Sequence, residues 1–356
     1  MEAVVSAPDP SFWAGRRVLV TGHTGFKGGW LALWLKRLGA QVSGYALAPE
    51  AHGFYELAGV RQTLQADWTA DVRDAPTLLD ALITAQPEVV FHLAAQPLVR
   101  ASYADPVGTF ATNVMGTAHL LDAVRQAGGV RAVVVVTSDK CYRDLGSPCR
   151  EEDALGGHDP YSASKAGAEI VAASYAASFD LPVATARAGN VIGGGDISTD
   201  RLVPDLLRAI DTSTPLHLRH PNAVRPWQHV LEPLAGYLKL AERLMDAPRD
   251  FGGAWNFGPR DLQGQPVSAV AERLLAHARA DGTAVPELTL GDGGGVHEAG
   301  VLLLDSTKAA ERLGWQGRLP LDVALHLTWQ WHRAHRAGQD LQALTLQQID
   351  SYASLT

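Results

Sequence analysis

Two short stretches of this sequence carry side chains that could move protons to and from a bound ligand. Ser138, Asp139 and Lys140 directly follow the most strand-like run in the chain. Tyr161 and Lys165 come later and are four positions apart, which places them on one face of a helix. In an open parallel sheet, ligands bind at the carboxyl ends of the strands. We therefore predict that the two stretches form one reaction centre.

Tyr161 and Lys165 could together remove a proton from a substrate hydroxyl. A free tyrosine has a pKa near 10, which is too high for an efficient base at neutral pH. A nearby ammonium group favours the phenolate and lowers this pKa. The pair could then take the proton while a hydride leaves the same carbon for a nicotinamide. The alternative is a tyrosine and a lysine on an exposed helix face without a chemical role.

A glycine-rich turn near the start of the chain predicts a site for a nucleotide cofactor. An apolar run, 16–20, precedes the turn, and a segment with helical apolar spacing, 29–38, follows it. In such a unit the glycines allow a close backbone approach, and the helix N-terminus offers free N–H groups to a pyrophosphate. The turn residues expected to contact the cofactor are Gly22, Thr24, Gly25, Phe26, Lys27 and Gly28.

The next strands supply the rest of the expected cofactor site. The second strand, 41–47, lacks the usual acidic residue for the ribose at its end, so this position does not distinguish NAD from NADP. Asp71 could accept a hydrogen bond from an adenine amino group, but Asp71 or Asp74 could equally cap the next helix. Small residues after strand 88–93 would let the cofactor lie against the backbone. The expected contacts here are Asp71, Val72, Leu93, Ala94, Ala95 and Gln96.

The order of elements predicts an α/β fold with two parts. Residues 14–188 alternate strand and helix, which indicates an NAD-binding Rossmann domain with a doubly wound parallel sheet. Asn113 lies in the expected helix 106–126, where asparagine is a poor helix former, so we expect it to bind the cofactor or to bridge elements; the alternative is an exposed asparagine that the helix tolerates. Residues 189–350 are expected to form mainly a smaller C-terminal α/β substrate-binding domain, with a segment near 225–260 returning to the first domain.

The composition limits the class of protein. The chain has 356 residues, of which 46% are hydrophobic and 19% charged, as in a globular protein with an ample core. Its net charge of -8 argues against broad electrostatic binding of nucleic acid or of an anionic membrane. Cys141 and Cys149 are expected to be reduced thiols, and no cysteine–histidine spacing suggests a metal site. Without a visible export signal or a membrane-spanning run, we expect a cytoplasmic protein.

Three motifs resemble the extended short-chain dehydrogenase/reductase family. They are TGHTGFKG at 21–28, HLAAQ at 92–96 and YSASK at 161–165. The resemblance covers nearly the whole chain. It implies a Rossmann domain, tightly held NAD, a nucleotide-diphosphate sugar as substrate, and a catalytic set formed by Ser138, Tyr161 and Lys165.

The two residues after Ser138 indicate one branch of that family. Sugar-nucleotide 4,6-dehydratases place acid/base groups there, commonly Asp-Glu, and this chain has Asp139-Lys140. This pair and the segments 187–196 and 225–233 resemble the dehydratases that act on CDP-glucose. The resemblance implies oxidation at C4, loss of water across C5–C6 and return of the hydride to C6. The product, CDP-4-dehydro-6-deoxyglucose, would supply deoxysugar synthesis, for example for lipopolysaccharide O-antigen.

Asp139 and Lys140 would carry the elimination step. Asp139 would protonate the departing C6 hydroxyl, which requires a carboxyl group with a raised pKa. Lys140 stands where a glutamate base is usual, and a lysine is a poor base unless it is desolvated or lies next to another cation. Lys140 either removes the C5 proton or orients the substrate while Asp139 and a water move the protons. A plain salt bridge between the two is the structural alternative.

The substrate diphosphate requires cations and directed donors. Arg225 matches the position where the family contacts a phosphate, and a planar guanidinium suits that role. The alternative for Arg225 is a salt bridge to Glu232 or Asp205. The substrate contacts that the resemblance implies are Gln96, Asn190, Arg201, Arg225 and His229.

The sequence leaves two other functions open. A nucleotide-sugar 4-epimerase would use the same Tyr161 and Lys165 but would need no acid/base pair beside Ser138. A non-catalytic nucleotide-sensing protein would typically have lost the tyrosine or the lysine.

The expected helices 106–126 and 160–179 are partly apolar on more than one face. Family members pair such helices into an intersubunit four-helix bundle, so a homodimer is expected.

Overall fold

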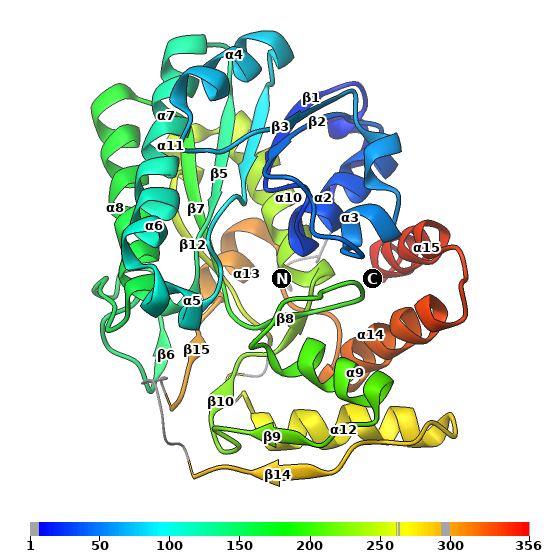
Figure 1. Cartoon of the computed structure of the whole chain (residues 1–356). Helices are drawn as coiled ribbons and strands as arrows, with labels where there is room; N and C mark the ends of the chain where they lie inside the picture. The colour runs from blue at the N-terminus through cyan, green and yellow to red at the C-terminus, as the bar shows by residue number, and fades with distance from the viewer. Residues whose placement is uncertain (1–6, 261, 263, 293–299, 356) are drawn as a thin grey trace.

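The computed structural model describes residues 7–260, 262, 264–292 and 300–355. Its centre is a seven-stranded sheet in which all neighbouring strands are parallel (Figure 1). The strand order is β12-β7-β5-β4-β1-β2-β3. The strands are β1 (Arg17–Thr21), β2 (Gln41–Ala46), β3 (Ala66–Thr69), β4 (Val89–His92), β5 (Ala132–Val136), β7 (Val183–Ala188) and β12 (Gly253–Phe257). This order is that of a Rossmann fold, so the predicted fold class is confirmed.

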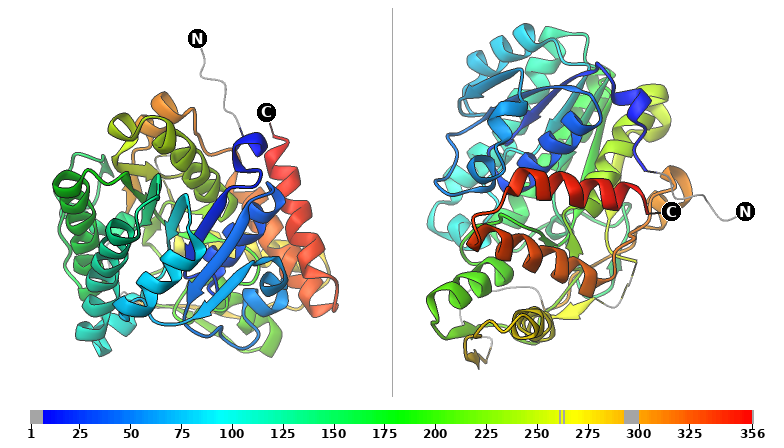
Figure 2. Two further views of the ribbon diagram at one scale, coloured as in Figure 1. Left: turned by 90° about the horizontal axis from the view of Figure 1, so that it is seen from above. Right: turned by 90° about the vertical axis from the view of Figure 1, so that its right-hand side faces the viewer.

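Helices cover both faces of this sheet because the central strands are apolar on both sides. In β5, Val133 and Val135 pack towards the helices of one face, whereas Val134 packs towards those of the other. The first face carries α4 (Ala75–Ala85), α7 (Gly116–Ala127) and α8 (Pro160–Phe179), and the second carries α2 (Phe26–Arg37) and α10 (Leu231–Asp246). The two layers of helices are visible on either side of the sheet in Figures 1 and 2.

The expected helix 106–126 is interrupted by a turn of π-helix. It consists of α6 (Pro106–Phe110), the π-helical segment η2 (Ala111–Met115) and α7. Asn113 lies in the π-helical turn and is buried. Single π-helical turns of this kind are frequent at functional sites. The short helix α5 (Val99–Ala104), which was not predicted, connects β4 to this segment.

A second group of elements lies beyond the carboxyl ends of the strands and has a core of its own. Its helices α9 (Leu202–Thr212), α12 (Val267–Ala280) and α14 (Leu321–Arg336) bury a common apolar cluster. Figure 1 shows this group below the sheet, with the ribbon of β9 (Leu216–Leu218) and β14 (Leu288–Leu290) at its edge. Between α9 and α12 the chain returns to the sheet for α10 and β12. The domain boundaries themselves stay a prediction.

Several elements were not predicted because their sequences lack a strong periodic pattern. Strand β3 is at the sheet edge and only partly buried, so its residues show no apolar run. The last helix, α15 (Leu341–Ala353), packs against α2 (Figure 2). Its Tyr352 hydroxyl donates a 2.7 Å hydrogen bond to Glu232 Oε2 on α10. The sequence also predicts a second glycine-rich turn, at 291–295, of which residues 293–295 lie outside the described residues.

The remaining elements are short connections. They are α1 (Pro10–Trp13), α3 (Phe54–Leu57), η1 (Val60–Thr63), η3 (Asp139–Cys141), β6 (Pro148–Cys149), β8 (Val191–Ile192), β10 (Val224–Arg225), β11 (Gln228–His229), α11 (Pro248–Phe251), β13 (Gln265–Pro266), β15 (Leu303–Leu304) and α13 (Thr307–Leu313). In the part of the chain that the structure describes, no helix combines the length and the apolar character needed to cross a membrane.

Candidate active site

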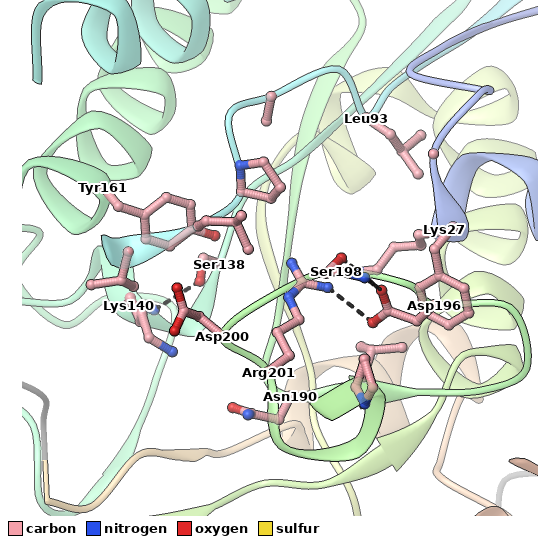
Figure 3. Close-up of a pocket in the computed structure, with 18 of the residues that line it drawn as sticks. Lys27, Leu93, Ser138, Lys140, Tyr161, Asn190, Asp196, Ser198, Asp200 and Arg201 are labelled. Carbon is pink, nitrogen blue, oxygen red and sulfur yellow. Dashed lines mark hydrogen bonds and ion pairs between the residues drawn. The ribbon is translucent and has the colours of Figure 1, made fainter. Parts of the chain in front are cut away.

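A cavity of about 650 Å³ opens at the carboxyl ends of the central strands. Figure 3 shows Tyr161, Ser138 and Lys140 on one side of it, with Arg201 and Asp196 across from them and Lys27 behind. Most of the predicted site residues line this cavity. They are Gly22, Thr24, Gly25, Phe26, Lys27, Gly28, Asp71, Val72, Leu93, Ala94, Ala95, Ser138, Asp139, Lys140, Tyr161, Lys165, Asn190, Arg201 and Arg225. Their individual roles stay predictions.

The glycine-rich turn between β1 and α2 has the geometry that a dinucleotide pyrophosphate requires. Gly22 adopts a φ of +74°, and a Cβ added to it would lie 2.7 Å from the backbone nitrogen of Ala94. A Cβ on Gly28 would lie 2.2 Å from the carbonyl oxygen of Gly22. Gly25 begins α2 without a side-chain cap, so no side chain covers the first N–H groups of the helix. These residues therefore fit a dinucleotide cofactor whose phosphates approach the helix N-terminus.

Asp71 and Asp74, the two acidic residues after β3, are placed differently: Asp74 caps a helix and Asp71 lines the cavity. Asp74 caps α4, because its carboxylate accepts a 3.2 Å hydrogen bond from the backbone nitrogen of Thr77. Asp71 lines the cavity instead, and its carboxylate is 2.6 Å from the Arg73 Nη2. The hydrogen bond from Arg73 lowers the pKa of Asp71. Asp71 is thus an ionised acceptor at the expected adenine end of the cavity.

The stretch after β5 forms a compact turn at the reaction end of the cavity. Ser138 Oγ accepts a 3.2 Å hydrogen bond from the backbone nitrogen of Lys140 and donates a 3.0 Å bond to Asp139 Oδ1. Asp139 is only 3% exposed, and its Oδ2 has no hydrogen-bond partner among the described residues. A buried acceptor without a partner is costly, so a ligand hydroxyl at this oxygen would be stabilising. Lys140 Nζ lies 3.8 Å from Asp139 Oδ1, and this side chain is 24% exposed.

Tyr161 and Lys165 lie on the cavity-facing side of α8, but the structure reverses the expectation for the tyrosine pKa. Burial raises the pKa of Tyr161 to about 12, although a hydrogen bond with Ser138 and the charge of Arg201 act in the opposite direction. Burial also lowers the pKa of Lys165 to about 8, and its Nζ donates a 3.2 Å hydrogen bond to the carbonyl oxygen of Val136. The expected lowering of the tyrosine pKa is therefore not found, because desolvation outweighs the nearby charges.

A buried ion pair supports this site from behind and was missed in the sequence. Glu169 Oε2 lies 2.8 Å from Arg187 Nη2, and each side chain is 3% exposed. Glu169 also accepts hydrogen bonds from the hydroxyls of Thr137 and Thr185. Arg187 donates a 2.8 Å hydrogen bond to the hydroxyl of Tyr142. A glutamate one turn after Lys165 and an arginine inside an apolar strand were the signals for this pair.

Gln96 and Asn113 do not line the cavity but hold the loop that does. Asn113 Oδ1 accepts a 2.8 Å hydrogen bond from the backbone nitrogen of Gln96, and its Nδ2 donates a 2.8 Å bond to Ser164 Oγ. The Gln96 amide donates to Thr109 Oγ1 at 2.9 Å. Asn113 therefore bridges the loop after β4 to α8, which is one of the two roles expected for it. The direct ligand contact expected for Gln96 is not supported, because its side chain turns towards α6.

His229 is also not brought to the cavity. It is fully buried in the core, with its ring packed edge-on against Trp30 at 5.9 Å. Burial lowers its pKa to about 3, so the ring is neutral. The expectation of a substrate contact at His229 is corrected by this position, since β11 directs the side chain beneath α2 and not towards the cavity.

The cavity mouth is rich in arginines, two of which were not predicted. Arg225 is 5% exposed and donates a 2.9 Å hydrogen bond to the carbonyl oxygen of Val224. Arg201 lies 3.3 Å from Asp196. The unpredicted residues Arg100 and Arg219 both bind Asp200, at 3.2 and 2.9 Å. The two acids proposed as alternative partners of Arg225 are bound elsewhere: Glu232 accepts from Tyr352, Arg318 and Leu319, and Asp205 pairs with Arg208.

Among the described residues, no group of three or more histidine, cysteine or acidic side chains is placed to hold a metal ion.

Comparison with known protein families shows to which family the chain belongs. The model of the NAD dependent epimerase/dehydratase family matches residues 18–258. The chain belongs to this family. The match spans the glycine-rich turn, Ser138, Tyr161 and the whole central sheet, and it confirms the family to which the sequence motifs are similar.

Relatives within the family include both dehydratases and epimerases. A CDP-glucose 4,6-dehydratase of Salmonella typhimurium is 44% identical, over 98% of this chain and 99% of the relative. A dTDP-glucose 4,6-dehydratase of Streptomyces antibioticus is 34% identical over 75% of this chain and 76% of the relative. Among solved structures, a dTDP-glucose 4,6-dehydratase of Streptomyces venezuelae with NAD bound has a TM-score of 0.76 at 26% identity, covering 91% of this chain and 99% of that one. A UDP-glucose 4-epimerase of Stenotrophomonas maltophila with bound NAD has a TM-score of 0.78 at 25% identity, with the same coverage.

The buried pair predicts a large effect of a small substitution. Glu169→Gln keeps the shape of the side chain but leaves the Arg187 charge buried without a partner, so we expect a loss of about 3–5 kcal/mol in the free energy of unfolding. Urea unfolding of the full chain measures it. Asp122→Asn, which breaks the exposed Asp122–Arg125 pair, is the control and should change stability by less than about 1 kcal/mol. A Glu169→Gln loss no larger than that of the control contradicts the supporting role of the pair.

Proposed function

We propose that this protein catalyses the NAD-dependent dehydration of CDP-glucose to CDP-4-dehydro-6-deoxyglucose. The observation that carries the proposal is the arrangement of Asp139 and Lys140 directly beside Ser138, Tyr161 and Lys165 in one cavity. An epimerase needs the last three residues but has no use for an acid and a base next to them. The choice of CDP-glucose among nucleotide sugars is supported by the relative from Salmonella typhimurium, which carries that name and matches nearly the whole chain.

The oxidising half of the site is formed by Tyr161, Ser138 and Lys165. When bound, NAD accepts a hydride from C4 of the sugar and later returns it to C6. Tyr161 removes the C4 hydroxyl proton, and Ser138, which is hydrogen-bonded to it, orients the phenol. Lys165 is held by the carbonyl oxygen of Val136 and supplies a cation that favours the phenolate. Burial raises the pKa of Tyr161 to about 12, and the positive charge of a bound nicotinamide ring would favour the phenolate.

The eliminating half of the site is formed by Asp139 and Lys140. Once C4 is a ketone, the C5 proton is acidic and the C6 hydroxyl becomes a leaving group. Asp139 protonates that hydroxyl through Oδ2, the buried oxygen without a partner. Lys140 removes the C5 proton, since it lines the same cavity within 3.8 Å of Asp139. Water leaves, and C5 is protonated again when the hydride reaches C6.

The substrate diphosphate is held at the cavity mouth. Arg225 and Arg201 line the cavity and provide planar donors suited to phosphate oxygens. Asn190 lies in the same wall, at the end of β7.

The product is a 4-keto-6-deoxy nucleotide sugar, a precursor for the deoxysugars of surface polysaccharides such as O-antigen. We also infer that the enzyme works in the cytoplasm, where Cys141 and Cys149 stay reduced; cell fractionation checks this.

Product analysis tests the reaction directly. We expect the protein with NAD to convert CDP-glucose to a 4-keto product that has lost one water, with little or no turnover of the dTDP-, GDP- and UDP-glucoses. Mass spectrometry of each incubation is the measurement. An isomer of unchanged mass would establish an epimerase instead, and preferential turnover of another nucleotide would contradict the CDP assignment.

The role of Lys140 has its own test. Lys140→Ala should slow elimination and C5 exchange by about 10²–10⁴-fold, the usual contribution of a general base, while oxidation at C4 still occurs. A substrate deuterated at C5 reports the exchange by mass spectrometry, and cofactor absorbance reports the oxidation. Lys36→Ala, an exposed lysine on α2, is the control. Exchange at near wild-type rate in Lys140→Ala would show that Lys140 only orients the substrate.

We further propose a homodimer formed through α6, η2 and α8. These neighbouring helices leave apolar side chains in solvent: Val107 is 78% exposed, Ile170 61% and Met115 50%. Figure 1 shows α6 and α8 together at one edge of the molecule. Pairing this edge with a second copy would bury these side chains in a bundle of helices.

Sedimentation analysis tests the dimer. Ile170→Glu places a charge in the proposed interface and should convert the dimer to a monomer. Ile83→Glu is the matched control, because Ile83 is 54% exposed on α4, outside these helices, and should leave the assembly unchanged. A monomeric wild-type protein, or a dimer that persists in Ile170→Glu, would refute the interface.

A further inference from the structure

The cavity has a third arm that neither the cofactor turn nor the reaction centre uses. It is lined by residues of α9, of β9 and of the start of α12. Its walls include the apolar side chains Val203, Pro204, Leu216 and Val267. If the substrate is a nucleotide sugar, as the proposed function holds, its sugar must reach Tyr161 while the cofactor occupies the turn after β1. The nucleoside must then enter this third arm, where apolar walls suit the faces of a base.

One carboxylate in this arm has an unused acceptor oxygen. Asp205, in the first turn of α9, lines the cavity, and its side chain is 27% exposed. Its Oδ1 binds Arg208 Nη2, whereas Oδ2 accepts no hydrogen bond from any described residue. The acid nearer the mouth, Asp200, differs because Arg100 and Arg219 already bind it. Asp205 therefore offers a charged acceptor to a ligand beside these apolar side chains, in a wall that also includes His217 and Arg219.

Arg208 fixes the orientation of this carboxylate. Besides its bond to Asp205, Arg208 donates hydrogen bonds of 3.0 Å to the carbonyl oxygens of Ile197 and Ser198. These contacts tie the guanidinium to the loop after β8, so it cannot follow a moving carboxylate. Burial raises the pKa of Asp205 despite the charge of Arg208, which shows that the protein itself leaves the carboxylate incompletely solvated.

We propose that Asp205 binds the exocyclic amino group of cytosine and thereby selects a cytidine nucleotide over a uridine or thymidine nucleotide. Cytosine presents an N–H donor at N4, whereas uracil and thymine present the acceptor O4 at the same position. A carboxylate can accept a hydrogen bond from N4 of cytosine. Opposite O4 of uracil or thymine, the same carboxylate would face a second acceptor and would form no hydrogen bond. Selection thus comes both from a charge-assisted hydrogen bond with the correct base and from an unpaired, partly buried acceptor with the wrong ones.

Equilibrium binding of CDP and of UDP to the full-length protein, measured by calorimetry, tests this selection without requiring turnover. The wild-type protein should bind CDP more tightly. Asp205→Asn should reduce the ratio of the two affinities by about 10–100-fold, the range for one hydrogen bond to a charged group, because its amide can donate to O4. Asp211→Asn is the matched control: it removes the same charge from the same helix, where Asp211 contacts His332 and does not line the cavity. It should leave the ratio unchanged.

A probe on the unaltered protein keeps the test independent of how Asp205→Asn folds. CDP dimethylated at N4 has lost both donors and should bind as weakly as UDP, or more weakly. An unchanged ratio in a folded Asp205→Asn protein, equal binding of CDP and dimethylated CDP, or a wild-type protein without preference for CDP each overturns the proposal. Selective CDP binding without dehydration of CDP-glucose would instead refute the proposed reaction while base selection by Asp205 stands.

Discussion

The site depends on the buried ion pair between Glu169 and Arg187. Two charges in the protein interior are stable only when each compensates the other and their remaining hydrogen-bonding capacity is met. The hydroxyls of Thr137 and Thr185 donate to the glutamate, and the Tyr142 hydroxyl accepts from Nη1 of the arginine. Only the arginine Nε has no partner among the described residues. Because Thr137 and Tyr142 flank Ser138, Asp139 and Lys140, the pair holds both ends of the reactive turn.

The same pair sets the position of the catalytic helix. Tyr161, Lys165 and Glu169 are each four residues apart in α8 and so lie on one face. Once Glu169 binds Arg187 on β7, the register of α8 against the sheet is determined, and the other two side chains are directed to the carboxyl end of β5. The placement of the proposed general base therefore depends on a contact one to two helical turns away from it.

The two halves of the molecule divide recognition from reaction. The groups proposed for oxidation and elimination lie on α8 and in the turn after β5, beside the turns after β1 and β4 that are expected to hold the cofactor. The arginines of the mouth and the arm with Asp205 belong mainly to segments beyond the sheet, where α9 and β9 can vary without disturbing the catalytic turn. This separation fits a family whose members share a nicotinamide reaction but differ in the nucleotide sugars named for them.

The local pattern of residues determined much of this protein. Alternating strands and helices predicted the sheet, and the limits of α8 agree with the predicted helix 160–179 because a capped helical period is a local signal. The glycine-rich turn and the spacing of Tyr161 and Lys165 likewise identified two sides of the cavity. Tertiary structure alone decided the rest. It buried His229, turned Gln96 away from the cavity, brought Arg100 to Asp200 across the mouth, and raised the pKa of Tyr161. These outcomes depend on desolvation and on contacts between residues far apart in the chain, which no local pattern of residues encodes.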